Sequence, residues 1–255
     1  MTGYTLGDKH LSCLREVVEA SKITPSETAL PWPVLGHLRT LIRCDNIQFT
    51  GIDYVAGYSY FAQWSQDDEQ SYDAEPDLTG KTEFFRLVKA GTPRTPWIPD
   101  KNEAVVSKLT DYMSDRQWRS LPVYVEFMRH GPGSKYGLYM NVPDGFSRQL
   151  RLLFFRESGS DFNERERFDL QLLMPHLEQA YRRGVASRVG AMLTPRQTSL
   201  LQLVREGFTN RQIARRMGLS EGTVRTHLNN IYARLEATSR TEAVTTVFGQ
   251  TQRIA

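Results

Sequence analysis

The segment from residue 193 to residue 249 contains four stretches in which a helix-capping side chain precedes apolar residues at helical spacing. The capping side chains are Thr194, Thr209, Ser220 and Ser239. Gly207 ends the first stretch and Gly218 the second, where tight turns are needed. Four short helices joined in this way are typical of a helix-turn-helix unit. The segment therefore predicts a small all-helical domain.

The third of these helices carries two different faces. With Arg225 set at 0° and about 100° per residue, its apolar side chains fall between about −60° and −120°. These apolar residues are Val224, Leu228, Ile231 and Leu235. Arg225, Thr226 and Asn229 fall roughly on the other side, near the start of the helix. Arg can pair with guanine, Asn with adenine, and the Thr methyl can contact thymine, so we predict a base-reading face. An ordinary polar helix face is the alternative.

The formal net charge is only +3, but it is unevenly distributed. Residues 188–255 carry ten arginines and four glutamates, a net +6, and the remaining 187 residues carry a net −3. Arginine pairs bidentately with phosphate and guanine, although a GC-rich coding sequence or a solvated surface gives the same bias. We predict phosphate contacts from the side chains of Arg211, Arg215, Arg234, Ser220 and Thr223, the last two at a helix N-terminus.

The body of the chain, residues 1–187, combines predicted strands with predicted helices. Residues rich in β-branched and aromatic types predict strands in 46–63, 136–141 and 148–156. Helices are predicted at 9–21 and 102–114, and from Asn163 onward with Pro175 kinking or splitting that helix. The acidic stretch 64–80 is expected to be an exposed loop. Strands flanked by helices imply an α+β domain with an antiparallel sheet.

These patterns divide the chain into a domain at 1–187, a linker at 188–192 and a helical domain at 193–255. No stretch approaches the ~18 consecutive apolar residues of a membrane span, and the N-terminus lacks the apolar segment of a secretory signal. Two cysteines, Cys13 and Cys44, exclude a disulfide scaffold. We therefore expect a cytoplasmic protein without a membrane partner, in which both thiols are unpaired. A redox switch between them is the alternative.

Six aromatic residues of the body could line a small-molecule pocket, although core packing explains each of them as well. They are Tyr58, Phe61, Trp97, Trp118, Tyr124 and Tyr139. No nucleophile–base pair, carboxylate dyad or metal-ligand cluster occurs at a recognisable spacing, and no phosphate-binding Gly–Lys motif is present. We therefore expect no enzymatic activity, no metal and no cofactor apart from an unidentified small-molecule ligand.

The run LTPRQTSLLQLVREGFTNRQIARRMGLSEGTVRTHLNNIYARLEATSRTEAV closely resembles the LuxR-type helix-turn-helix of bacterial transcription factors. It departs from the usual pattern at Gln197, where Glu is typical, and at Glu236, which replaces a glycine. The resemblance implies that the third helix enters the major groove of double-stranded DNA, with Arg225, Thr226 and Asn229 reading bases. It also implies that the fourth helix pairs two copies of the chain. The residues implied in that pairing are Ala243, Val244 and Val247.

The body is similar to the GAF-like N-terminal halves of actinobacterial LuxR-family regulators, and a PAS-like domain is close to that description. The similarity rests on stretches that include Gln117-Trp118-Arg119, Pro122-Val123-Tyr124 and Asp161-Phe162-Asn163. It implies a transcriptional regulator whose N-terminal domain senses a small molecule or mediates dimerisation, with RNA polymerase left open as a partner. The alternatives are a quorum-sensing regulator that binds an acyl-homoserine-lactone-like autoinducer and an enzyme with a regulatory tail.

Overall fold

The computed structural model describes residues 7–25, 27–54, 57–67, 69–73, 86–87, 103–129, 135–144, 148–235 and 237–248. The chain separates into two compact units, Met1–Tyr181 (unit 1) and Arg182–Ala255 (unit 2). The division falls inside one long helix, α5 (Glu164–Met192), so residues 188–192 are helical. Pro175 lies within α5 and does not end it. The predicted limits at residues 187 and 193 stay predictions.

Unit 1 is built on a six-stranded sheet in the order β3-β2-β1-β6-β5-β4, and every neighbouring pair is antiparallel. The strands are β1 (Asn46–Asp53), β2 (Tyr58–Gln66), β3 (Glu69–Asp73), β4 (Val105–Lys108), β5 (Tyr136–Pro143) and β6 (Arg148–Arg156). The predicted α+β architecture with an antiparallel sheet is confirmed. The two central strands, β1 and β6, lie about a hundred residues apart in the sequence.

The two edge strands, β3 and β4, form where the sequence predicts a loop and a helix. Part of the predicted loop 64–80 forms β3, which pairs with β2 from Gln66↔Glu69 to Ala62↔Asp73. Part of the predicted helix 102–114 forms β4, which pairs with β5, followed by the short 3-10 helix η1 (Leu109–Asp111). In both places, hydrogen bonding to an existing strand outweighs the local preference of the residues.

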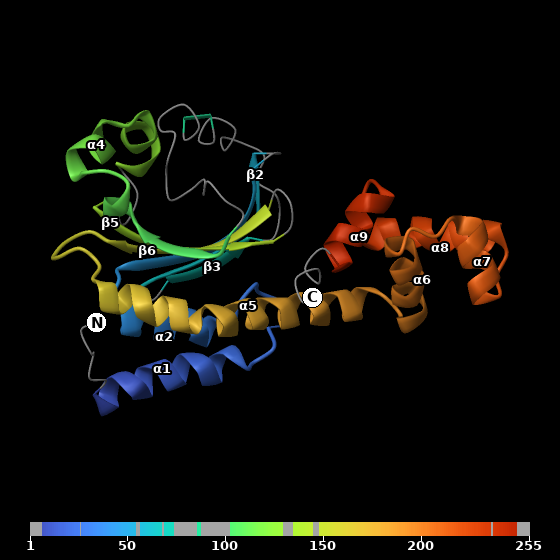
Figure 1. Ribbon diagram of the computed structural model, residues 1–255, viewed down its shortest axis with the longest axis horizontal. Coiled ribbons are helices and arrows are strands. Elements are labelled where there is room, and N and C mark those ends of the chain that lie inside the picture. Colours follow the sequence, from blue (N-terminus) through green and yellow to red (C-terminus); the bar gives the residue numbers. More distant parts are fainter. Residues whose placement is uncertain are drawn as a thin grey trace. The chain divides into compact units, whose positions relative to one another are not determined.

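Helices cover both faces of this sheet (Figure 1). Helices α1 (Asp8–Ser21), α2 (Trp32–Ile42) and α5 lie on one face. The short helix α4 (Asp115–Ser120) lies on the other, followed in sequence by η2 (Tyr124–Met128). Because successive strand residues point to opposite faces, each face has its own set of side chains.

The face toward α2 and α5 is apolar. Its fully or almost fully buried side chains are Ile47, Phe49, Leu138, Leu150, Leu152 and Phe154. The ring of Phe49 meets that of Tyr181 from α5 at a centroid distance of 5.7 Å. At one end of the sheet, Arg156 donates to the carbonyl of Ile42 at the end of α2 and to the carboxylate of Glu166 on α5, both at 2.9 Å. This arginine therefore ties two helices to β6.

The two cysteines differ in exposure, and neither forms a disulfide. Cys44 is buried, and this burial raises the pKa of its thiol to about 12, whereas Cys13 is half-buried. Because the thiolate is the reactive form, we expect an aromatic disulfide reagent near neutral pH to titrate Cys13 alone in the folded chain and both thiols in denaturant. A Cys13→Ser variant should show no fast reaction. Fast labelling of that variant would contradict the buried placement of Cys44.

Candidate nucleic-acid interface and sensor face

Unit 2 contains four helices after α5, each beginning where a predicted cap stands. They are α6 (Pro195–Arg205), α7 (Asn210–Met217), α8 (Glu221–Arg234) and α9 (Arg240–Phe248). Thr194 and Gln197 form the predicted capping box of α6. The Ser220 hydroxyl accepts the amide N–H of Thr223 at 3.0 Å and so caps α8. Gly218 ends α7 with φ at +65°, a left-handed conformation that favours glycine.

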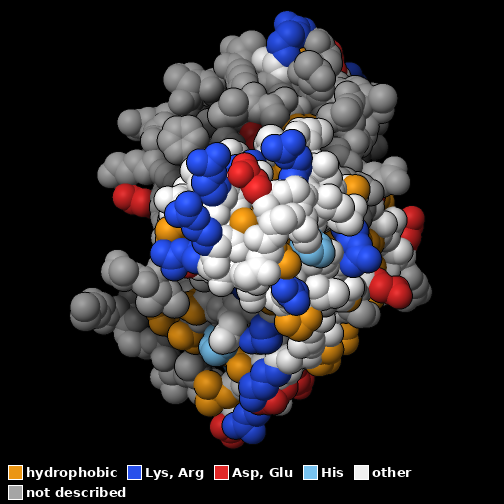
Figure 2. Space-filling model, turned by 90° about the vertical axis from the view of Figure 1, so that its right-hand side faces the viewer, with side chains coloured by type: hydrophobic (Ala, Val, Ile, Leu, Met, Phe, Trp, Pro, Cys, Tyr) orange, Lys and Arg blue, Asp and Glu red, His pale blue; other side chains and the backbone are white. Residues whose placement is uncertain are grey.

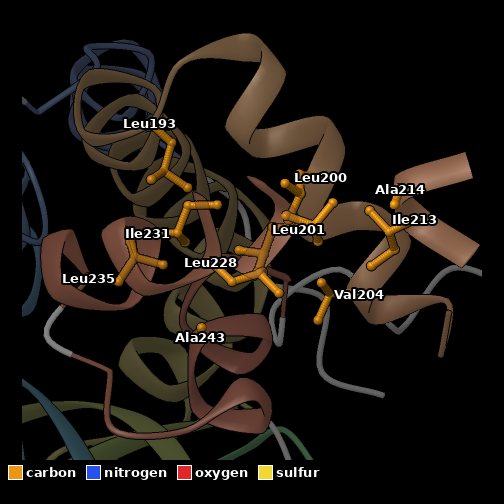
Figure 3. Close-up of a cluster of buried hydrophobic side chains, with 11 residues drawn as sticks. Leu193, Leu200, Leu201, Val204, Ile213, Ala214, Leu228, Ile231, Leu235 and Ala243 are labelled. Carbon is orange, nitrogen blue, oxygen red and sulfur yellow. The ribbon is translucent and has the colours of Figure 1, made fainter. Parts of the chain in front are cut away.

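The apolar faces of these helices converge on one core (Figure 3). The predicted stripe of α8 is buried as expected, with Val224 and Ile231 fully inaccessible and Leu228 and Leu235 nearly so. Leu201 of α6 and Ile213 of α7 pack in the same cluster. Because one side of α8 is fixed to this core, its opposite side is held outward.

The three predicted base-reading residues all lie exposed on α8. Among the described residues, neither Arg225 nor Asn229 has a hydrogen-bond or ionic partner in unit 2. The Thr226 hydroxyl donates to the carbonyl of Gly222 at 3.2 Å, which occupies its proton and leaves the methyl group exposed. The face therefore presents a guanidinium, an amide and a methyl group side by side, which is the chemistry that reads base edges.

The predicted phosphate-contacting residues fall into two groups. Arg215 on α7 is exposed and without a partner among the described residues. The other four make internal contacts. Arg211 lies 3.6 Å from the carboxylate of Glu221, Arg234 donates to the carbonyl of Met192 at 3.2 Å, and the hydroxyls of Ser220 and Thr223 bond each other at 2.8 Å. An exposed pair such as Arg211–Glu221 is weak and can open to a phosphate.

Two further arginines of unit 2, Arg240 and Arg216, make contacts within the chain. Arg240 donates to the carbonyl of Phe208 at 2.5 Å and to the side chain of Asn210 at 3.3 Å, so it joins α9 to the turn between α6 and α7. Arg216 stacks on the ring of Phe208 at 4.0 Å. Other arginine side chains, such as those of Arg196, Arg215 and Arg225, are exposed on unit 2, and blue side chains are visible on the surface that faces the viewer in Figure 2.

The sequence pattern did not distinguish one exposed arginine, Arg196, from the other arginines of unit 2. Arg196 lies in the first turn of α6, exposed and without a partner among the described residues. It lines a groove of about 220 Å³ together with His227 of α8 and Leu219. Its place beside the α6 cap was visible in the sequence, but its nearness to α8 was not. We add Arg196 to the candidate phosphate contacts.

The structure removes one of the three residues that were predicted to form the dimer contact. Ala243 is fully buried in the core of its own unit, because the short helix α9 uses this small side chain to pack against α6 and α8. It cannot also contact a second copy of the chain. Val244 and Val247 are half-buried at the edge of the same core, so the proposed contact is reduced to these two valines.

The sheet separates the predicted pocket residues. Trp118, Tyr124 and Tyr139 share one cluster, with the rings of Trp118 and Tyr124 5.2 Å apart. Phe61 lies on the opposite face, where it packs on Tyr181 at 5.7 Å. Tyr58 is half-buried at the start of β2, and Trp97 lies outside the described residues. The face that carries Trp118, Tyr124 and Tyr139 is called the α4 face below.

Two further searches were limited to the described part of the chain. Within it, no group of three or more His, Cys, Asp and Glu side chains is arranged to hold a metal ion. Among its helices, none combines the length and the apolar character that a membrane-spanning segment requires.

Comparison with known proteins agrees with the geometry of unit 2. Residues 191–247 match the family described as bacterial regulatory proteins, luxR family. The chain is 39% identical over 85 residues to the monoamine regulon transcriptional regulator of Klebsiella aerogenes, covering 32% of this chain and 37% of that one. It is 25% identical over 163 residues to the transcriptional activator protein CarR of Pectobacterium carotovorum subsp. carotovorum, covering 59% of this chain and 63% of that one. The chain thus spans less than two thirds of the length of either relative.

A solved structure extends the comparison to the whole chain. The crystal structure of Escherichia coli SdiA is similar with a TM-score of 0.53, at 16% sequence identity, and the match covers 96% of this chain and 99% of that one. At this identity the likeness concerns the fold alone. Residues 191–247, in which every predicted helix is in place, thus form a helix-turn-helix domain of the kind found in the luxR family of bacterial regulatory proteins.

Proposed function

We propose that this chain is a sequence-specific, DNA-binding transcriptional regulator that acts as a homodimer. The observation that carries the proposal is the outward face of α8, where Arg225, Thr226 and Asn229 stand exposed on a helix fixed to a core by its other side. The match of residues 191–247 to a family of regulatory proteins supports it.

In this proposal α8 enters the major groove and its three exposed residues contact base edges. The N-terminus of α8, with the hydroxyls of Ser220 and Thr223, lies against one phosphate strand. Arg215, Arg211 and Arg196 contact phosphates and so contribute binding affinity that does not depend on the base sequence. Val244 and Val247 on α9 bring two copies together, and a two-fold dimer would bind half-sites about one helical turn of DNA apart.

We assign a sensory or dimerising role to unit 1. Aromatic side chains gather on the α4 face, and binding sites for small molecules are lined predominantly by such side chains. An acyl-homoserine-lactone-like autoinducer is the alternative signal that the sequence resemblance leaves open. The cytoplasm is the expected location of such a regulator.

The test is selection of DNA sites by the full chain from random duplexes, followed by titration of a selected duplex in increasing salt. We expect one enriched, two-fold symmetric sequence. We also expect log K to fall linearly with log salt, with a slope of about −0.9 for each phosphate contact. The control is a scrambled duplex, which should bind weakly but show a similar dependence on salt. Absence of enrichment, or affinity independent of salt, would contradict the proposal.

A further inference from the structure

The centre of the α4 face contains a buried arginine that no acidic side chain of the described residues pairs with. Arg151 lies in the middle of β6 and is 3% exposed. Its Nε donates to the side-chain oxygen of Asn141 at 3.2 Å. Its Nη2 is buried and has no hydrogen-bond partner. No carboxylate among the described residues pairs with it, and burial lowers the pKa of this guanidinium.

The other two arginines of β6 behave differently. Arg156 pairs with Glu166 at 2.9 Å, and Arg148 lies 3.4 Å from the carboxylate of Asp53. Buried charges in proteins are normally paired in this way, because taking an unpaired ion out of water is costly. Among the three arginines of β6, Arg151 is therefore the one whose charge no carboxylate of the described residues compensates.

The neighbours of Arg151 add further hydrogen-bonding groups. In the sheet register, Thr50 of β1 and Asn141 of β5 stand directly opposite Arg151, so all three side chains point to the same face. The Thr50 hydroxyl is buried and has no partner. On β4, the buried hydroxyl of Ser107 also has no partner, and Ser107 stands opposite Tyr139 on this face. Arg151 and Thr50 thus present two unused polar groups on adjoining strands, whereas Ser107 lies two strands away from Arg151, beside Tyr139.

Apolar groups lie beside this polar row. Leu153 and Phe155 follow Arg151 on the same face of β6 and pack in one cluster with Trp118, Tyr124 and Tyr139. A ligand on this face would meet the guanidinium of Arg151 and the hydroxyl of Thr50 at one end and aromatic and aliphatic carbon at the other. A neutral headgroup would leave the charge of Arg151 unpaired, whereas a carboxylate matches the guanidinium fork.

We propose that unit 1 binds an organic acid with an apolar body, whose carboxylate pairs with Arg151 and accepts a hydrogen bond from the Thr50 hydroxyl. This inference rests on the proposed sensory role of unit 1 and names the chemical class of its signal. An organic acid is thereby favoured over the neutral lactone as the class of ligand.

The experiment measures thermal unfolding of the full chain by tryptophan fluorescence. All four tryptophans, Trp32, Trp64, Trp97 and Trp118, lie in unit 1, so the signal reports on that unit. The probes are octanoate and phenylacetate, each matched with its neutral amide, together with N-octanoyl-homoserine lactone. We expect at least one acid at millimolar concentration to raise the midpoint by about 3 °C or more, and the amides and the lactone to leave it unchanged.

Two variants separate binding from structure. Arg151→Met should abolish the response to acid and leave the midpoint without probe equal to or above that of the wild type, because it removes an unpaired buried charge. Arg156→Met, the matched change on the same strand, should lower the midpoint because Glu166 loses its partner, while the response to acid remains.

Three outcomes overturn the inference: no shift by either acid in the wild type, an equal shift by an acid and its amide, or a response that survives Arg151→Met. A large loss of stability in Arg151→Met without probe would assign Arg151 a structural role and would also overturn it. The assay contains no DNA, so its failure is distinct from failure of the proposed DNA binding, which the salt titration measures separately.

Discussion

Replacing Arg225 with alanine should weaken binding to the selected DNA site by about 1–3 kcal/mol, which is roughly 5- to 150-fold in Kd. The side chain is exposed on α8 and has no hydrogen-bond or ionic partner among the described residues of unit 2, so its removal should leave the fold intact. The loss should also be specific, because a bidentate contact to one base distinguishes that base from the others. Fluorescence anisotropy with the selected duplex and with single-base variants measures both effects.

The matched control for this prediction is Arg215→Ala. Arg215 is equally free of partners but stands on α7, where we propose a phosphate contact. This variant should lose affinity evenly across all duplexes, and its salt slope should fall by about 1. If Arg225→Ala kept the full preference of the wild type among single-base variants, the assignment of base reading to Arg225 would be wrong.

Replacing Ile231 with alanine should have the largest effect on stability, a loss of about 2–5 kcal/mol from unit 2. Ile231 is fully buried at the middle of the core that fixes α8, and the smaller side chain would leave a cavity there. Since that core positions the base-reading face, DNA binding should weaken together with folding. Circular dichroism at 222 nm during thermal unfolding measures the loss.

Two controls make the Ile231 result specific. Asn230→Ala, an exposed change one residue away, should alter stability by no more than about 0.5 kcal/mol. The tryptophan transition, which reports on unit 1, should stay in place in the Ile231→Ala variant. Unfolding at the wild-type temperature in both signals would contradict the central place of Ile231 in the core of unit 2.

The sequence predicts unit 2 well because its determinants are local. Capping side chains, helical spacing and turn glycines act within a few residues of one another, and each helix begins at its predicted cap. The outward face of α8 follows directly, because burying Val224, Leu228 and Ile231 leaves Arg225 and Asn229 on the other side. Local patterns were less informative in unit 1, where β3 and β4 form by pairing with strands rather than by their own preference.

The sequence by itself therefore determined the helices of unit 2, the exposed face of α8 and the antiparallel character of the sheet. Tertiary structure alone decided which side chains make contacts within the chain, since Ala243 fills a core and Arg240 bonds to residues 30 and 32 positions away. It also placed Phe61 and Tyr139 on opposite faces. Above all, it set Thr50, Asn141 and Arg151 in one row that no acid of the described residues joins. Strand register, a long-range property, creates that row, and no local periodicity encodes it.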